Sequence, residues 1–167
     1  MTRLTLITAL LLMTGIQVAK SQQGGGLRNP KLGIGLEAAI GDTKIGTGYS
    51  LNFQSPITRN LNWTATVGKT NLSSTLKVMP KPKYENWVTK VGVKYFLTEQ
   101  FYVAGDLGAA FDQIQRKTTR FAWSPGLGAE LNIFGESALD VALKYEAYQS
   151  GNPLRFFALK VALNLGL

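Results

Sequence analysis

The final fourteen residues of the chain, Leu154–Leu167, constrain its fold more than any other segment. From Phe157 onward every odd position is apolar, and every even position is small or polar. This period of two predicts a β-strand with one apolar face and one small or polar face. The strand exceeds the average strand of a soluble domain and matches the ~9–11 residues that a tilted strand needs to cross a bilayer.

A membrane-spanning strand at the chain terminus must be paired on both edges, because lipid offers no hydrogen-bond partners. This condition predicts a closed barrel in which the last strand pairs with the first. Seven further segments alternate in the same way between turn residues, and none shows a helical period. The sequence therefore predicts an all-β fold, an eight-stranded antiparallel up-and-down transmembrane β-barrel, with strands at Lys31–Gly41, Ile45–Gln54, Leu61–Leu72, Tyr84–Phe96, Phe101–Asp112, Phe121–Phe134, Ala138–Tyr148 and Leu154–Leu167.

The N-terminal 21 residues predict a signal peptide. Arg3 supplies the positive region, Leu4–Ile16 is apolar, and Ala19 and Ser21 are small residues placed for cleavage before Gln22. The apolar stretch is too short for a membrane-spanning helix. We therefore divide the chain into a signal peptide at 1–21, a flexible lead-in at 22–30 and a barrel at 31–167.

The polarity of the two strand faces separates two classes of barrel. A soluble lipocalin-like barrel turns its apolar residues inward, whereas a membrane barrel has a polar lumen and an apolar exterior. Most strand glycines share the polar face, as expected for a narrow lumen in which a glycine makes room for a long side chain opposite. We predict a lumen network of ion pairs made by Glu37, Lys90, Lys94, Asp106, Asp112, Glu130, Asp140, Lys144, Glu146 and Lys160.

Two further features concern the strands themselves. Aromatic residues lie near both ends of the apolar face, which predicts one aromatic girdle at each membrane interface. They are Trp87, Phe111, Trp123 and Phe157 at the loop end, and Phe53, Trp63, Tyr95 and Phe101 at the turn end. Pro125 lies inside the sixth strand and predicts a bulge or the membrane boundary, because proline cannot donate to the ladder.

Composition excludes several classes of function. The formal charge is +8, yet no basic run exceeds two residues, so we expect no nucleic-acid partner. Cysteine and histidine are both absent, which excludes Cys/His metal sites, cysteine nucleophiles and histidine-based triads. The carboxylate pairs Asp106/Asp112 and Asp140/Glu146 are interpreted as lumen ion pairs. We expect no enzymatic activity, no cofactor and no metal.

Residues 31–167 resemble the small outer-membrane β-barrel family of Gram-negative bacteria, of the OmpA/OmpX-like type. The segment from Val91 to Gly108 and the terminal strand carry the resemblance. The family's C-terminal assembly signal is matched by Lys160, Ala162, Leu165 and Leu167, although the family usually ends in an aromatic residue. The resemblance implies localisation in the cell outer membrane, contact with membrane lipid and with the outer-membrane assembly machinery, and a monomer.

Basic residues in the predicted external loops are candidates for contact with lipopolysaccharide phosphates, with ordinary solvated lysines as the alternative. They are Lys77, Lys81, Lys83, Arg116, Lys117 and Arg120. We expect an integral outer-membrane protein with a charge-filled lumen, basic external loops and a structural or interaction role at the cell surface. The alternative is a small-solute pore or a ligand-binding barrel, including a soluble periplasmic lipocalin-like barrel.

Overall fold

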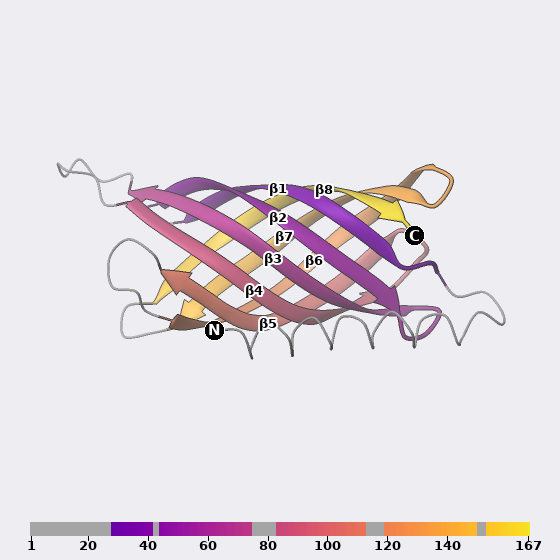
Figure 1. Cartoon of the computed structure of the whole chain (residues 1–167), viewed down its shortest axis with the longest axis horizontal. Helices are drawn as coiled ribbons and strands as arrows, with labels where there is room; N and C mark the ends of the chain where they lie inside the picture. Colours follow the sequence, from indigo (N-terminus) through magenta and orange to yellow (C-terminus); the bar gives the residue numbers. More distant parts are fainter. Residues whose placement is uncertain (1–27, 42–43, 75–82, 113–118, 150–152) are drawn as a thin grey trace, which may run out of the picture.

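A computed structural model describes residues 28–41, 44–74, 83–112, 119–149 and 153–167. Eight antiparallel strands, each hydrogen-bonded to its neighbours in sequence, close into a barrel (Figure 1). No helix in the described residues is long and apolar enough to cross a membrane. The strands are β1 (Lys31–Gly41), β2 (Lys44–Pro56), β3 (Leu61–Ser74), β4 (Lys83–Phe96), β5 (Phe101–Asp112), β6 (Thr119–Phe134), β7 (Ser137–Gln149) and β8 (Leu154–Gly166).

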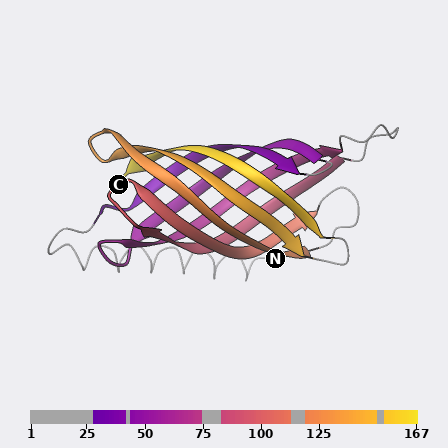
Figure 2. The same ribbon diagram turned by 180° about the vertical axis from the view of Figure 1, so that it is seen from behind.

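The barrel closes where β8 meets β1, as the sequence predicted. Leu36 in β1 lies opposite Tyr49 of β2 on one side and opposite Val161 of β8 on the other. Figure 2, seen from behind, shows the same tilted strands continuing around the far side. Both edges of β8 are therefore paired, and the sheet has no open edge.

One end of the barrel carries the short connections, and we call it the turn end. There Ile57 N and Thr58 N donate to Leu61 O at 2.8 and 3.0 Å, and Leu97 N donates to Phe101 O at 2.8 Å. Leu167 N donates to Pro30 O at 2.9 Å, so both ends of the barrel segment also lie here (Figure 1). The opposite end, where β1, β3, β5 and β7 each connect to the next strand, is the loop end.

The structure corrects the prediction of a bulge at Pro125. Trp123 lies opposite Ala147, and Gly126 lies opposite Lys144, so the register on the β7 side is the same before and after the proline. The register shift lies instead between Asn132 and Phe134, beside the β6–β7 turn. A proline removes one ladder donor without adding a residue, so the neighbouring strands stay in step.

Burial alternates along every strand and shows which face is inside. The outward Leu36 is 69% exposed, whereas the inward Asn164 is fully buried. The exposed large side chains of the strands are overwhelmingly apolar, and the buried set is rich in amides, hydroxyls and charges. This polarity is the reverse of a soluble barrel and matches a barrel surrounded by lipid, so the lipocalin-like alternative is wrong.

Candidate functional site

The candidate site is the lumen, where the structure places all ten side chains of the predicted ion-pair network on the inward face. Eight of them are buried, and Glu37 and Lys144 are partly buried. Buried charges require partners, because an isolated charge loses several kcal/mol of solvation. The network forms four connected groups between the turn end and the loop end.

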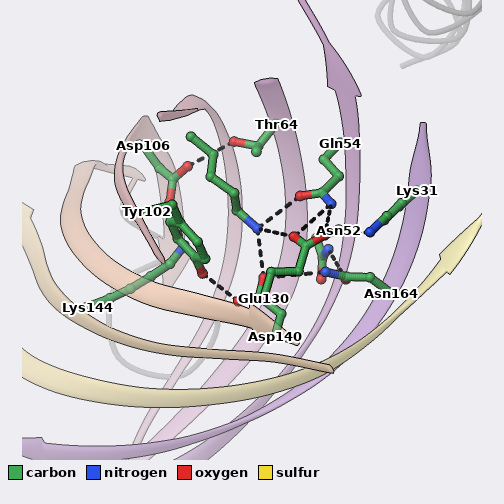
Figure 3. Close-up of polar contacts among 11 residues, drawn as sticks. Lys31, Asn52, Gln54, Thr64, Tyr102, Asp106, Glu130, Asp140, Lys144 and Asn164 are labelled. Atoms are coloured by element: carbon green, nitrogen blue, oxygen red, sulfur yellow. Dashed lines mark hydrogen bonds and ion pairs between the residues drawn. The ribbon is translucent and has the colours of Figure 1, made fainter. Parts of the chain in front are cut away.

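The group nearest the turn end is centred on Glu130 of β6. Lys31 Nζ of β1 lies 2.6 Å from Glu130 Oε1, and Gln54 Nε2 of β2 donates to Glu130 Oε2 at 3.1 Å. Lys94 Nζ of β4 reaches the same carboxylate at 3.3 Å. Figure 3 shows Glu130 and Gln54 meeting by dashed contacts, although they come from strands far apart in the sequence.

Asp140 of β7 extends this group through Lys94. Lys94 Nζ lies 2.8 Å from Asp140 Oδ2, and it also donates to Gln54 Oε1 at 2.9 Å. The Tyr102 hydroxyl donates to Asp140 Oδ1 at 2.5 Å, and Lys94 Nζ lies 4.2 Å from the centre of the Tyr102 ring. Lys94 therefore uses all three of its donors and connects two carboxylates from neighbouring strands.

Two further groups fill the middle of the lumen. Lys144 Nζ lies 2.6 Å from Asp106 Oδ2, and the Thr64 hydroxyl donates to Asp106 Oδ1 at 3.1 Å (Figure 3). Lys90 Nζ lies 2.7 and 2.8 Å from the two oxygens of Glu146. Together with the group at the turn end, these pairs join strands that are not neighbours in the sheet.

The group nearest the loop end corrects the prediction for Arg120. We expected Arg120 in an external basic loop, but it lies within β6, which begins two residues earlier than predicted. Its side chain is buried, and its Nη2 lies 3.3 Å from Asp112 Oδ2. The alternation of β6 continues past Phe121, so Arg120 falls on the inward face beside a carboxylate of the neighbouring strand.

Sequence reasoning missed two bases of the network, and they balance its charge. The ten predicted residues include four lysines and six carboxylates. Lys31 and Arg120, both buried, bring this set to six bases and six carboxylates. The alternation of β1 indicates the position of Lys31, since Lys31 lies six residues before Glu37, an even spacing that places both on the inward face. No local sequence pattern identifies Glu130 as the partner of Lys31, because the two residues are 99 positions apart.

Lys160 differs from the other lumen lysines. It is 4% exposed, and no described side chain accepts a hydrogen bond from its amino group. Glu37, its partner in the β1–β8 register, accepts a hydrogen bond from the Ser50 hydroxyl at 3.0 Å. Lys160 therefore belongs to a lumen with equal numbers of bases and carboxylates, but it makes no direct ion pair with any described residue.

Glycines provide the space for the network. Four charged lumen residues each lie directly across from a glycine of the adjacent strand, as Glu37 with Gly48, Lys90 with Gly108, Asp106 with Gly92, and Lys144 with Gly126. A Cβ on Gly126 would lie 2.8 Å from Lys144 Cγ, closer than real Cβ contacts come. At these four positions the glycine leaves room in the narrow lumen for the charged side chain opposite.

The remaining space inside is small. A cavity of about 20 Å³ is bordered by Lys94, Lys144, Lys160, Asp106 and Asp140, together with uncharged polar residues. Its volume has room for about one water molecule. Among the described residues no cluster of acidic side chains could hold a metal ion. The arrangement favours a filled interior over a passage for solutes.

The outer surface carries the two predicted aromatic girdles. At the loop end Trp123 and Phe157 both contact Tyr145, with ring centroids 5.7 and 5.3 Å apart. At the turn end Phe53 and Trp63 lie 5.3 Å apart. Aromatic rings at both ends of an apolar band are typical of a barrel held between two membrane interfaces.

The other predicted site residues are only partly within the described chain. Lys77, Lys81, Arg116 and Lys117 lie outside the described residues, and Lys83 is the first residue of β4. Of the predicted assembly signal, Lys160 and Ala162 point inward, whereas Leu165 is exposed on the outer face of β8. Leu167 follows β8 and is exposed.

Comparisons with known proteins agree with this fold. No protein-family model matches the sequence, and no curated protein matches it either. The outer membrane protein Ail of Yersinia pestis, in a phospholipid bilayer nanodisc, is 15% identical with a TM-score of 0.55, and the match covers 81% of this chain and 99% of that chain. A crystal structure of Ail is 12% identical with a TM-score of 0.56, covering 83% of this chain and 97% of that chain.

A third similar structure is the outer membrane protein OprG from Pseudomonas aeruginosa. It is 11% identical with a TM-score of 0.50, and the match covers 86% of this chain and 99% of that chain. At such identities the similarity establishes the fold and not the role. The chain has the fold of outer-membrane β-barrels, as its resemblance to the OmpA/OmpX-like type implied.

Proposed function

We propose that this protein is an integral outer-membrane barrel with a structural or interaction role at the cell surface, exported by its N-terminal signal peptide. The observation that carries the proposal is the polarity of the barrel, with ion pairs buried inside and apolar side chains exposed outside. This arrangement is favourable in a lipid bilayer, because an apolar outer face along all eight strands would be unfavourable in water.

Fractionation and heating test the membrane assignment. We expect the protein in the outer-membrane fraction, extracted only by detergent, and we expect unheated and boiled samples to migrate differently on a gel because the closed barrel resists detergent. A protein recovered from the soluble periplasm without detergent, with no change of migration on heating, would contradict the proposal.

The filled lumen supports an interaction role over a pore. The ion-pair groups lie across the lumen, and a cavity bordered by their side chains measures only about 20 Å³. We therefore propose that the chain acts through the surface of its loop end, as a monomer without catalytic activity, after insertion by the outer-membrane assembly machinery.

We propose further that basic residues at the loop end bind lipopolysaccharide phosphates. The candidates are Lys77, Lys81, Lys83, Arg116 and Lys117. Arg120 is not a candidate, because its guanidinium is buried against Asp112. A cation near an anionic headgroup gains about 1 kcal/mol. The combined substitutions Lys77→Gln, Lys81→Gln and Lys83→Gln should weaken lipid A binding, whereas Lys69→Gln should not, because Lys69 is already paired with Glu85. Unchanged binding in the triple variant would contradict this contact.

A further inference from the structure

The turn end of the barrel contains a second polar feature that the proposed surface role does not use. A basin of about 450 Å³ opens there, between the lead-in before β1 and the three short turns. Its volume falls within the ~300–1,000 Å³ of small-molecule sites. The described part of the lead-in lies at this end, beside the chain terminus (Figure 1). Four separate segments of the chain therefore converge on one concave surface.

Arg28, in the lead-in, is held in place on one side of this basin. Its Nη2 donates to Glu99 O at 2.7 Å, and its Cζ lies 3.7 Å from the centre of the Phe96 ring. A guanidinium has five N–H donors, and the bond to Glu99 uses one of them. Stacking on an aromatic face leaves the edge of a guanidinium available for further hydrogen bonds. Arg28 is thus positioned before any ligand arrives.

Arg59, in the β2–β3 turn, lines the same basin. Among the described residues, neither Arg28 nor Arg59 lies within ion-pair distance of a carboxylate, and Lys31 beneath them is already paired with Glu130. The planar fork of a guanidinium matches the two oxygens of a carboxylate or a phosphate. Two arginines without acidic partners in one basin form a site suited to an oxyanion.

We propose that this basin binds a small molecule carrying one carboxylate or phosphate group, through Arg28 and Arg59. The neutral side chains of Asn60, Thr98 and Asn132 line the same basin and supply hydrogen bonds to the rest of a polar ligand. Glu99 and Glu136 also line it, so a ligand with several negative charges is disfavoured. The ligand is therefore a small molecule with a single anionic group and with hydroxyl, amide or amino groups beside its charged end.

The proposal is tested by titration of the folded barrel in a glucoside detergent, which carries no phosphate. Sodium phosphate, sodium acetate and short-chain phosphatidylglycerol are added separately, and the amide NMR signals of the turn end are followed, with sodium chloride at equal ionic strength as reference. We expect saturable shifts with phosphate and acetate. Shifts with phosphatidylglycerol alone would assign the basin to lipid headgroups and overturn the small-molecule site.

Matched variants decide whether the two arginines are responsible. Arg28→Gln and Arg59→Gln should each weaken binding about fivefold or more, the loss expected for a charge-assisted contact at an accessible site. Arg59→Lys should recover only part of the loss, because it keeps the charge without the fork. Arg155→Gln at the loop end is the control and should bind normally. Equal weakening in Arg155→Gln, or shifts that chloride reproduces, would overturn the proposal.

Discussion

At the scale of single residues, Lys94 and Lys160 both lie on the inward face of the barrel but differ in the contacts of their amino groups. Lys94 makes ion pairs with Glu130 and Asp140 and a hydrogen bond to Gln54. Lys160 is equally buried and has no direct acceptor among the described side chains. Removing one partner of a buried pair typically costs 3–5 kcal/mol, because the other charge remains buried.

We predict that Lys94→Met lowers the free energy of unfolding by about 3 kcal/mol or more. Lys160→Met should leave it unchanged or raise it, because this substitution removes a desolvated charge and breaks no ion pair. Urea unfolding of both variants in lipid vesicles measures the difference. If Lys160→Met proved as destabilising as Lys94→Met, Lys160 would have a partner that the described contacts do not include.

Two glycines in neighbouring strands give a second comparison. A Cβ on Gly92 would collide with Asp106 Oδ1 and with Gly105 O, whereas a Cβ on the outward Gly105 meets nothing within 4 Å. Gly92→Ala should therefore destabilise the barrel by about 1–3 kcal/mol through overpacking. Gly105→Ala should be neutral or slightly stabilising, because it lowers the entropy of the unfolded chain. Equal unfolding midpoints for the two variants would refute the packing role of Gly92.

At the scale of elements, β8 closes the barrel by pairing with β1. Its outward side chains alternate without interruption from Phe157 to Leu165, and its register with β1 is continuous from Phe157 to Gly166. Leu167 is exposed beyond the strand, and its amide donates to Pro30 O. Leu167 therefore contributes little to the packing of the folded barrel.

We predict that Leu167→Asp impairs insertion into outer membranes while leaving the folded barrel stable in detergent. Leu167→Phe should insert at least as well as the wild type, because the family resemblance implies an aromatic terminal residue. The measurement is the fraction of heat-modifiable protein in isolated outer membranes. Normal insertion of Leu167→Asp would show that the assembly signal lies elsewhere in β8.

At the scale of the whole molecule, the charged lumen and the apolar exterior are the two faces of the same eight strands. Eight strands leave an interior only just wide enough for side chains. Twelve charged side chains lie on its inward face, and ten of them form the four groups described above. A lumen occupied by side chains distinguishes an eight-stranded barrel from larger pores, which enclose an aqueous channel.

We predict that the purified protein in planar bilayers shows no large, stable single-channel steps, since the ion pairs block the lumen. Recordings at equal protein-to-lipid ratios, with boiled protein as the control, measure this. Stable steps of porin size that depend on the folded protein would contradict a filled lumen and would favour the pore alternative.

Most of the architecture could be predicted from the sequence, because alternation is a local property. The bounds of β1 and β5 agree with the prediction, and the inward and outward faces agree along all eight strands. The disagreements occur where alternation alone does not decide the outcome. Thr119 and Arg120 extend β6 beyond the predicted loop boundary, and the register shift lies beside the β6–β7 turn instead of at Pro125.

The partners within the lumen could not be predicted, because they depend on the width of the barrel and the stagger of its strands. Lys31 meets Glu130, which is 99 residues away, and Asn52 meets Asn164, which is 112 residues away. The sequence by itself determined the strands, their faces and the lipid-facing surface, since each follows from neighbouring residues. Only the tertiary structure decided which charge pairs with which, because closing the barrel brings opposite walls within reach of one another.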